Sequence, residues 1–324
     1  MTSHLKRIAV LGTICLLGAL PLSGCNLTKN DEETLTIVTT VYPSYDFALQ
    51  LTEQFDLSCD VKLLLTPGGE SHSYEPTPSD VAAIQTCDMF IYIGGASETW
   101  VEYLLESTRK EKVNLRLMDY VTPIAAAHNH EQDHEDKHEH HEKHEADLAE
   151  YDEHIWTSPL NAAAMVRAIA AQLCSISPEN QETCKTNEDA LCNTLQTLDA
   201  AYRSAAESAG SKPLIFGDRF PFLYLAEEYG FSYAAAFSGC SSDTDASSAT
   251  LSALISTVKE QQIDTIFYLE NSPRKIADAI CEATGAQAKL LHSCNNVSKE
   301  DFSSGKHFQE YLQDNLIAIK EALN

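Results

Sequence analysis

The twelve histidines of this 324-residue chain fall into two groups that could bind metal in different ways. Seven of them lie in the stretch "AHNHEQDHEDKHEHHEKHEAD", residues 127–147, together with eight acidic residues and two lysines. Imidazoles and carboxylates bind zinc, copper, nickel and iron. The stretch has almost no apolar residues that could form a core. It is therefore predicted to be disordered without metal and to hold ions only loosely.

Two segments of this stretch, "HEQDH" and "HEDKH", match HExxH, the signature of zinc proteases. In those enzymes a packed helix places both histidines on one face, and the glutamate acts as a base. Here the two matches overlap within a low-complexity stretch that has no apolar face, so the pattern arises by chance. A metalloprotease is not expected.

Four histidines lie outside this stretch and outside the N-terminal segment: His72, His154, His292 and His307. The first follows a predicted strand, the second precedes a predicted helix, and His292 ends a predicted strand. Ligands of parallel α/β lobes bind beyond the carboxyl ends of the strands, so these three side chains could converge on one ion. Three or four nitrogen and oxygen ligands suit Zn²⁺. For each histidine alone, a surface or capping role is the alternative, and His307 is expected at the surface.

The elements that must position these histidines alternate between strands and helices. In the first half, strands are predicted at 34–43, 60–66 and 88–94, and helices at 44–55, 79–87 and 99–108. In the second half, strands are predicted at 213–218, 232–237, 264–270 and 288–292, and helices at 221–230, 249–262, 273–285 and near 306–323. Helical patterns at 158–177 and 187–209 lie between the halves. This alternation predicts a parallel sheet in each half.

The predicted fold class is therefore α/β, with two α/β lobes joined by a long helix and a metal site in the cleft between them. The N-terminal lobe is predicted at 34–186, with a disordered His/acid-rich loop at 126–150. The connecting helix is predicted at 187–211 and the C-terminal lobe at 212–324. No internal sequence repeat is evident.

The N-terminal 24 residues have the features of a secretory signal. Lys6 and Arg7 precede an apolar run at 8–22, which is shorter than the roughly 20 residues that a transmembrane helix needs. The segment Leu22-Ser23-Gly24-Cys25 resembles a bacterial lipobox, which implies cleavage before Cys25 and its lipidation. Residues 25–33 then form a polar tether, and the protein is expected to be extracytoplasmic and lipid-anchored to the outer face of the cell membrane. An ordinary cleaved signal peptide is the alternative.

The net charge and the cysteines limit the possible partners. A formal net charge of −26 argues against nucleic acid and suits cationic ligands, although solubility alone would also explain it. Eight of the ten cysteines follow Cys25, and an even count in an exported protein suggests disulfides. No CxxC pair occurs, so a structural zinc knuckle is not expected. Cys240 and Cys294 lie at predicted strand ends and are expected to form a disulfide, with thiolate ligation of a metal as the alternative.

Two motifs, "GGESHSYEPTPSD" at 68–80 and "EHIWTSP" at 153–159, resemble those of the bacterial receptors for zinc and manganese ABC importers, the cluster A-I solute-binding proteins. The resemblance covers essentially the whole chain after the signal. It implies a four-ligand site between two rigid lobes, with His72 and His154 as the first two ligands, and delivery of the ion to a membrane permease. It also implies a monomeric binding protein rather than an enzyme. Histidine favours Zn²⁺ over Mn²⁺ as the transported ion.

The chain departs from the family pattern at the other two ligands. Family members usually have a histidine after the first strand of the second lobe, where this chain has Gly217 and Asp218. The usual fourth ligand is an acid after the last strand, where this chain has His292. An exchange of roles predicts the ligand set His72, His154, Asp218 and His292. For Asp218, an ion pair with Arg219 is the alternative.

Two further acids could support the site. Glu270 ends a predicted strand and is the reserve ligand, or an acceptor for a ligand imidazole N–H. Glu70, close to His72 in sequence, could act in the same way, with a solvated loop acid as the alternative.

Two other functions remain open from the sequence. A zinc hydrolase would use His72, His154 and His292 and keep a water in an open fourth position, which a carboxylate ligand would fill instead. A surface metal buffer would act through the His-rich loop and would show several weak sites without a strong one.

Overall fold

The computed structural model describes residues 34–106, 112–126, 151–208, 212–239 and 246–323. The predicted signal peptide, the lipidated Cys25, the tether and nearly all of the His-rich loop lie outside these residues. Within them, residues from 34 onward belong to one compact unit.

In the part of the chain that the structure describes, eight strands form two parallel sheets of four. The first sheet has the order β2-β1-β3-β4 and contains β1 (Thr34–Thr39), β2 (Ser58–Leu63), β3 (Met89–Tyr92) and β4 (Val113–Arg116). The second has the order β6-β5-β7-β8 and contains β5 (Leu214–Phe220), β6 (Tyr233–Ser238), β7 (Thr265–Tyr268) and β8 (Gln287–Leu290). The strand order is the same in both sheets, although the sequence shows no repeat. The predicted fold class is confirmed.

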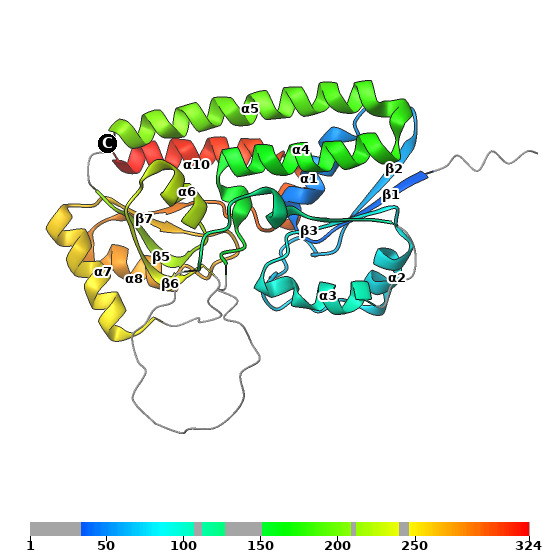
Figure 1. The fold of residues 1–324 in the computed structure, drawn as a ribbon. Helices are drawn as coiled ribbons and strands as arrows, with labels where there is room; N and C mark the ends of the chain where they lie inside the picture. The colour runs from blue at the N-terminus through cyan, green and yellow to red at the C-terminus, as the bar shows by residue number, and fades with distance from the viewer. Residues whose placement is uncertain (1–33, 107–111, 127–150, 209–211, 240–245, 324) are drawn as a thin grey trace, which may run out of the picture. The chain divides into compact units, whose positions relative to one another are not determined.

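Helices cover the two sheets and join them. In the first lobe these are α1 (Tyr42–Leu51), α2 (Pro78–Thr86) and α3 (Thr99–Glu106); in the second they are α6 (Leu223–Tyr229), α7 (Ser248–Gln261), α8 (Lys275–Thr284) and α9 (Lys299–Ser304). The helices α4 (Pro159–Ile176), α5 (Gln181–Ser208) and α10 (Phe308–Leu323) lie across the top of the molecule in Figure 1. The central strands are covered on both faces and are therefore apolar, and all four residues of β3 are buried.

The connecting helix α5 runs alongside both lobes (Figure 1). Its 28 residues give it a length of about 42 Å. The helix was predicted to begin at residue 187 but begins six residues earlier. The early turns are polar apart from the buried Cys184, so they show little apolar periodicity in the sequence.

The helix α4 is long and apolar enough to cross a membrane by length and composition alone. Its buried side chains belong to the main core, where they pack with those of α5, so its apolar character is that of a core helix.

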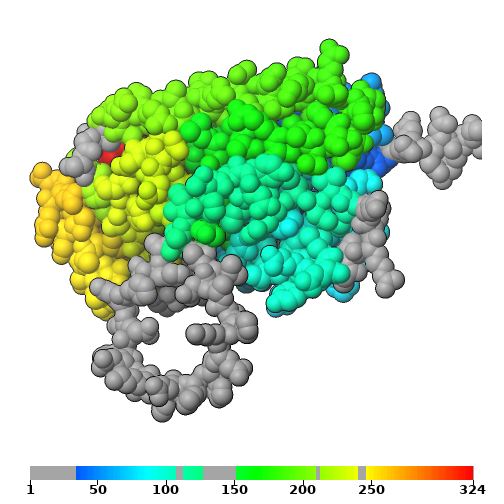
Figure 2. Space-filling model, viewed as in Figure 1, coloured from blue at the N-terminus to red at the C-terminus, as the bar shows by residue number. Residues whose placement is uncertain are grey.

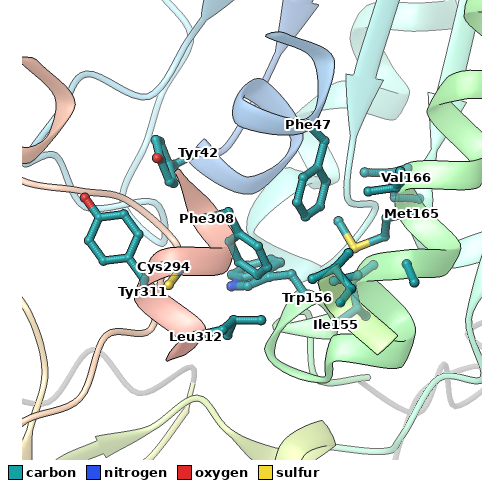
Figure 3. Close-up of a cluster of buried hydrophobic side chains, with 14 of the residues drawn as sticks. Tyr42, Phe47, Ile155, Trp156, Met165, Val166, Cys294, Phe308, Tyr311 and Leu312 are labelled. Carbon is teal, nitrogen blue, oxygen red and sulfur yellow. The ribbon is translucent and has the colours of Figure 1, made fainter. Parts of the chain in front are cut away.

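One hydrophobic core extends through both lobes. It contains β-strand residues of both sheets and the large side chains of α10. Figure 3 shows its centre, where Trp156 lies among Phe47, Met165, Phe308 and Leu312. Each lobe also has a smaller core cluster of its own, around Ile84 and Phe90 in the first lobe and around Ile215 and Ile266 in the second.

Backbone hydrogen bonds also join the first lobe to the segment 293–297 of the second. The amide of Tyr42 donates to the carbonyl of Asn295 over 3.2 Å, and that of Gly68 donates to Val297 over 2.8 Å. The indole Nε1 of Trp156 donates to the carbonyl of Ser293 over 2.8 Å. In the space-filling view, the first lobe (cyan to teal) and the second lobe (yellow) are in contact below α4 and α5 (Figure 2). These contacts fix the position of each lobe at the boundary between them.

The loop that carries His72 is anchored at its far end by Asp80, in the first turn of α2. The Asp80 carboxylate accepts hydrogen bonds from the Thr77 hydroxyl at 2.7 Å, the Tyr74 hydroxyl at 2.9 Å and Lys62 Nζ at 2.9 Å. Burial alone would raise the pKa of Asp80, but these hydrogen bonds outweigh it and lower the pKa to about 2. The carboxylate therefore favours the folded state while it is ionised.

We expect the Asp80→Asn substitution to lower the free energy of unfolding at pH 7 by about 1–2 kcal/mol. The folded-state pKa is lower than the unfolded one, so this contribution is present above about pH 4 and is lost as the pH falls toward 2. Urea unfolding at pH 7, 4 and 3 would measure it. The exposed Asp119 is the control, and Asp119→Asn is expected to change stability by less than about 0.5 kcal/mol. An equal effect of both substitutions at pH 7 would contradict the anchoring role.

Candidate metal centre

A cavity of about 270 Å³ lies between the two sheets, beyond the carboxyl ends of several strands. Both lobes line it. The first lobe contributes Glu70, His72 and His154, and the second contributes Asp218, Arg219, Glu270 and Ser293. This is the position at which parallel α/β lobes bind ligands.

His72 and His154 lie side by side in this cavity, with their ring centroids 5.6 Å apart. His72 lies in the loop between β2 and α2, and its Nδ1 is 2.8 Å from the Ser97 hydroxyl and 3.0 Å from Oε1 of Glu153. His154 precedes the 3₁₀ turn that leads into α4, is only 2% exposed, and has its Nδ1 3.0 Å from Oδ1 of Asp152. Each imidazole thus has a buried carboxylate at Nδ1.

These carboxylates assign the imidazole tautomers. In the neutral ring, an Nδ1–H that donates to a carboxylate leaves the lone pair on Nε2. A carboxylate behind a histidine in this way orients the ring and makes it a better metal ligand. This arrangement of His72 and His154 suits coordination of a cation through Nε2.

Glu153 is the functional residue that the sequence reasoning missed. Ligand atoms of His72, Glu153 and His154 all lie within 4.8 Å of one another, which is close enough for one metal ion. The Glu153 carboxylate accepts from the Ser97 hydroxyl at 2.6 Å and the Ser97 amide at 3.0 Å. Burial acts to raise the pKa of Glu153, but the hydrogen bond from His72 and the electrostatic interaction with the His154 and His72 rings lower it to about 2. The only signal in the sequence was its place directly before His154 in "EHIWTSP".

We expect Glu153→Gln to weaken zinc binding by about 10–100-fold, the usual cost of losing an outer partner of a metal ligand. The amide keeps the size of the side chain but removes the charge that holds the Nδ1–H of His72. Chelator competition would measure the affinity, with Glu102→Gln on α3 as a matched control. An unchanged affinity in Glu153→Gln would show that this carboxylate takes no part in binding.

Asp218 lines the cavity, as the sequence predicted, but its carboxylate is held by backbone amides. Its Oδ1 accepts from the Arg219 amide at 2.8 Å, and its Oδ2 accepts from the Leu269 amide at 3.1 Å. The sequence left an ion pair between Asp218 and Arg219 as the alternative. Arg219 instead pairs with Glu70, with Nη1 at 2.9 Å from Oε2. Burial would raise the pKa of Glu70, but Arg219 and His72 lower it overall. Glu70 thus links the second lobe to the His72 loop.

Glu270 also lines the cavity, and its carboxylate holds the turn that follows β8. It accepts from the Ser293 amide at 2.8 Å, the Ser293 hydroxyl at 2.5 Å and the Cys294 amide at 3.1 Å. Burial raises its pKa. The hydrogen bonds go to this turn rather than to an imidazole.

The structure does not bring His292 to the other two histidines, which corrects its predicted placement. Its ring packs edge-on against Tyr311 on α10, with centroids 4.9 Å apart, and its backbone is paired with Asn315. Burial and the nearby Lys306 lower its pKa. The next residue, Ser293, lines the cavity instead.

The predicted disulfide partner Cys294 is a buried, free thiol whose Sγ faces the backbone carbonyl of His292 at 3.7 Å. Burial raises its pKa well above the usual range, which disfavours the thiolate needed for metal ligation. Cys240 lies outside the described residues.

Comparison with known proteins matches this chain to a family of zinc-uptake proteins. The family model described as zinc-uptake complex component A, periplasmic, matches residues 37–322. The chain is 34% identical over 296 residues to the high-affinity zinc uptake system protein ZnuA of Bacillus subtilis, which covers 91% of this chain and 89% of that protein. It is 32% identical over 318 residues to the zinc-binding lipoprotein AdcA of Streptococcus pneumoniae, and spans 98% of this chain but only 61% of that protein.

Solved structures show the same fold. The Zn(II)-bound ZnuA-like domain of Streptococcus pneumoniae AdcA superposes with a TM-score of 0.73 at 30% identity, covering 90% of this chain and 99% of that domain. The metal-dependent lipoprotein YcdH of Bacillus subtilis superposes with a TM-score of 0.74 at 30% identity, covering 90% of this chain and all of that chain.

Proposed function

Since this chain belongs to the zinc-uptake complex component A family, we propose that it is the solute-binding component of a zinc-importing ABC system. It captures Zn²⁺ between its lobes and delivers the ion to a membrane permease. The family consists of transport binding proteins rather than enzymes. The observation that carries the proposal is the pair of imidazoles, His72 and His154, each backed by a buried carboxylate in the cavity between the lobes.

The proposed ligands follow from the lining of the cavity. His72 and His154 coordinate through Nε2, and Asp218 supplies an oxygen from the second lobe. Glu153 orients His72 rather than binding the ion, because its carboxylate holds Nδ1 of His72 and, unlike Asp218, does not line the cavity. His292 does not belong to this set, since its ring packs against α10.

The chain acts at the outer face of the cell membrane in this proposal, held there by a lipid on Cys25. The relatives with lipoprotein names and the periplasmic family description support this location. The lipobox-like Leu22-Ser23-Gly24-Cys25 supplies the attachment point.

Metal selectivity tests the proposal. Two imidazoles in a three-ligand set favour Zn²⁺ over Mn²⁺, because manganese prefers more oxygen ligands. We expect chelator competition to find one zinc bound tightly per chain, with manganese weaker by at least about 10-fold. Manganese binding as tight as zinc, or only several weak zinc sites, would overturn the assignment.

A further inference from the structure

Seven cysteines lie in the part of the chain that the structure describes, and all seven are free thiols. Two of them, Cys174 and Cys184, lie on adjacent helices that are joined by a short turn. Cys174 is near the end of α4 and Cys184 is in the first turns of α5, with the 3₁₀ turn Pro178–Asn180 between them. The chain reverses its direction at this turn, which brings the two cysteines opposite each other.

The packing of α4 on α5 brings these thiols together. Cys184 Sγ lies 3.8 Å from the carbonyl oxygen of Ala170, which is one helical turn before Cys174 on the same face of α4. The side chains of α4 at this interface are small, so a sulfur of α5 can reach its backbone. Burial, and then the charge and hydrogen bond of the neighbouring Cys174, raise the pKa of Cys184 to about 12. The two thiols are therefore in contact.

We propose that Cys174 and Cys184 form a disulfide that joins α4 to α5 when the protein is exposed to an oxidising environment. The proposal rests on the extracytoplasmic location argued above, because disulfides persist in such compartments. It does not depend on the identity of the transported metal.

The geometry excludes Cys192 as a disulfide partner of Cys174. Cys192 lies on the same side of α5 but eight residues beyond Cys184, about 12 Å along the helix axis. Its Sγ is 3.8 Å from the carbonyl of Ala163, farther toward the start of α4. Cys192 is therefore not within disulfide distance of Cys174.

The reaction requires a disulfide-containing oxidant such as oxidised glutathione. The half-buried Cys174 is the accessible thiol, and its thiolate attacks one sulfur of the oxidant, forms a mixed disulfide and releases one thiol. The Cys184 thiolate then attacks Cys174 Sγ, forms the intramolecular bond and releases the second thiol. The cysteine pair loses two electrons, and the oxidant gains them. The high pKa of Cys184 makes the second step slow, because little thiolate is present.

Peptide mapping of the full chain tests the proposal. The chain is incubated with oxidised glutathione, denatured, alkylated without reductant and digested with trypsin. The fragment 168–185 contains these two cysteines and no others. In the oxidised chain we expect this fragment to carry no alkyl group on either cysteine. Its mass should be lower than that of the unalkylated dithiol fragment by two hydrogens. Cleavage at Glu179 or Glu182 should then leave two pieces that separate only after reduction.

Variants give a second readout. Oxidation is expected to raise the Tm by a few degrees in the unmodified chain and in Cys192→Ser, and dithiothreitol should reverse the rise. Cys174→Ser and Cys184→Ser should show no such rise. Alkylation of both cysteines in the oxidised chain, or a bond from either of them to another cysteine, would overturn the proposal. Zinc affinity is measured separately, so failure of the disulfide is distinguishable from failure of the zinc-binding function.

Discussion

Zinc binding to the His154→Ala variant is expected to be more than about 100-fold weaker than binding to the unmodified chain, a larger loss than removal of an outer partner causes. His154 is buried, and its ring is fixed by Asp152 at Nδ1 and by edge contact with Trp156 at 5.4 Å between centroids. The substitution removes one of the two imidazoles that face the cavity. Chelator competition at neutral pH would measure the affinity.

A matched control separates loss of the ligand from loss of the fold. His307→Ala removes a histidine whose side chain is 46% exposed and pairs with Asp46 instead of lining the cavity. Its zinc affinity should be unchanged. Circular dichroism and thermal unfolding should show that both variants are folded. A folded His154→Ala protein that still binds one zinc with the original affinity would contradict the proposed site.

The Trp156→Ala substitution is expected to have the largest effect on stability, lowering the free energy of unfolding by about 3–5 kcal/mol. Trp156 is 1% exposed and lies at the centre of the shared core among Phe47, Met165 and Phe308 (Figure 3). Truncation leaves a cavity there. It also removes the indole donor to the carbonyl of Ser293, which leaves that group without this partner. Urea unfolding followed by circular dichroism would measure the change.

The only other tryptophan of the chain is the control. Trp100 lies on α3, is half-buried, and packs against Tyr74 with centroids 5.8 Å apart. Trp100→Ala should cost clearly less than Trp156→Ala. Equal losses would mean that the core around Trp156 does not join the two lobes as described.

Much of the fold was predictable because the strands of a parallel sheet are continuous apolar runs. The segments 88–94 and 264–270 contain β3 and β7, and the loop after the predicted strand at 60–66 gave the position of His72. The strand β4, "VNLR", was not predicted because it is short and half polar. Its identity depends on pairing with β3, which is a tertiary contact that the local sequence does not show.

In the second lobe, the local sequence does not determine which residue after β8 faces the cavity. The strand β8 ends at Leu290, two residues before His292, so strand alternation no longer determines which side that residue faces. Packing against Tyr311 and the pairing with Asn315 direct its ring toward α10. Only the residues of a distant helix decide between His292 and Ser293 as the one that faces the cavity.

Glu153 shows the opposite case, in which a residue lay inside a recognised motif without an assigned role. Its contacts to His72 and Ser97 join segments that are 81 and 56 residues away in sequence. No local pattern predicts such contacts, because they depend on how the segment before α4 meets the loops after β2 and β3.

The most direct test of the central claim is zinc affinity by chelator competition in four proteins: the unmodified chain, a chain lacking residues 128–147, the His72→Ala variant, and the two changes combined. The cavity site predicts one tightly bound zinc with the same Kd after the deletion, and loss of that zinc in both proteins that carry His72→Ala. Loss of tight binding with the deletion, together with no effect of His72→Ala, would contradict the account and assign the tight site to the His-rich segment.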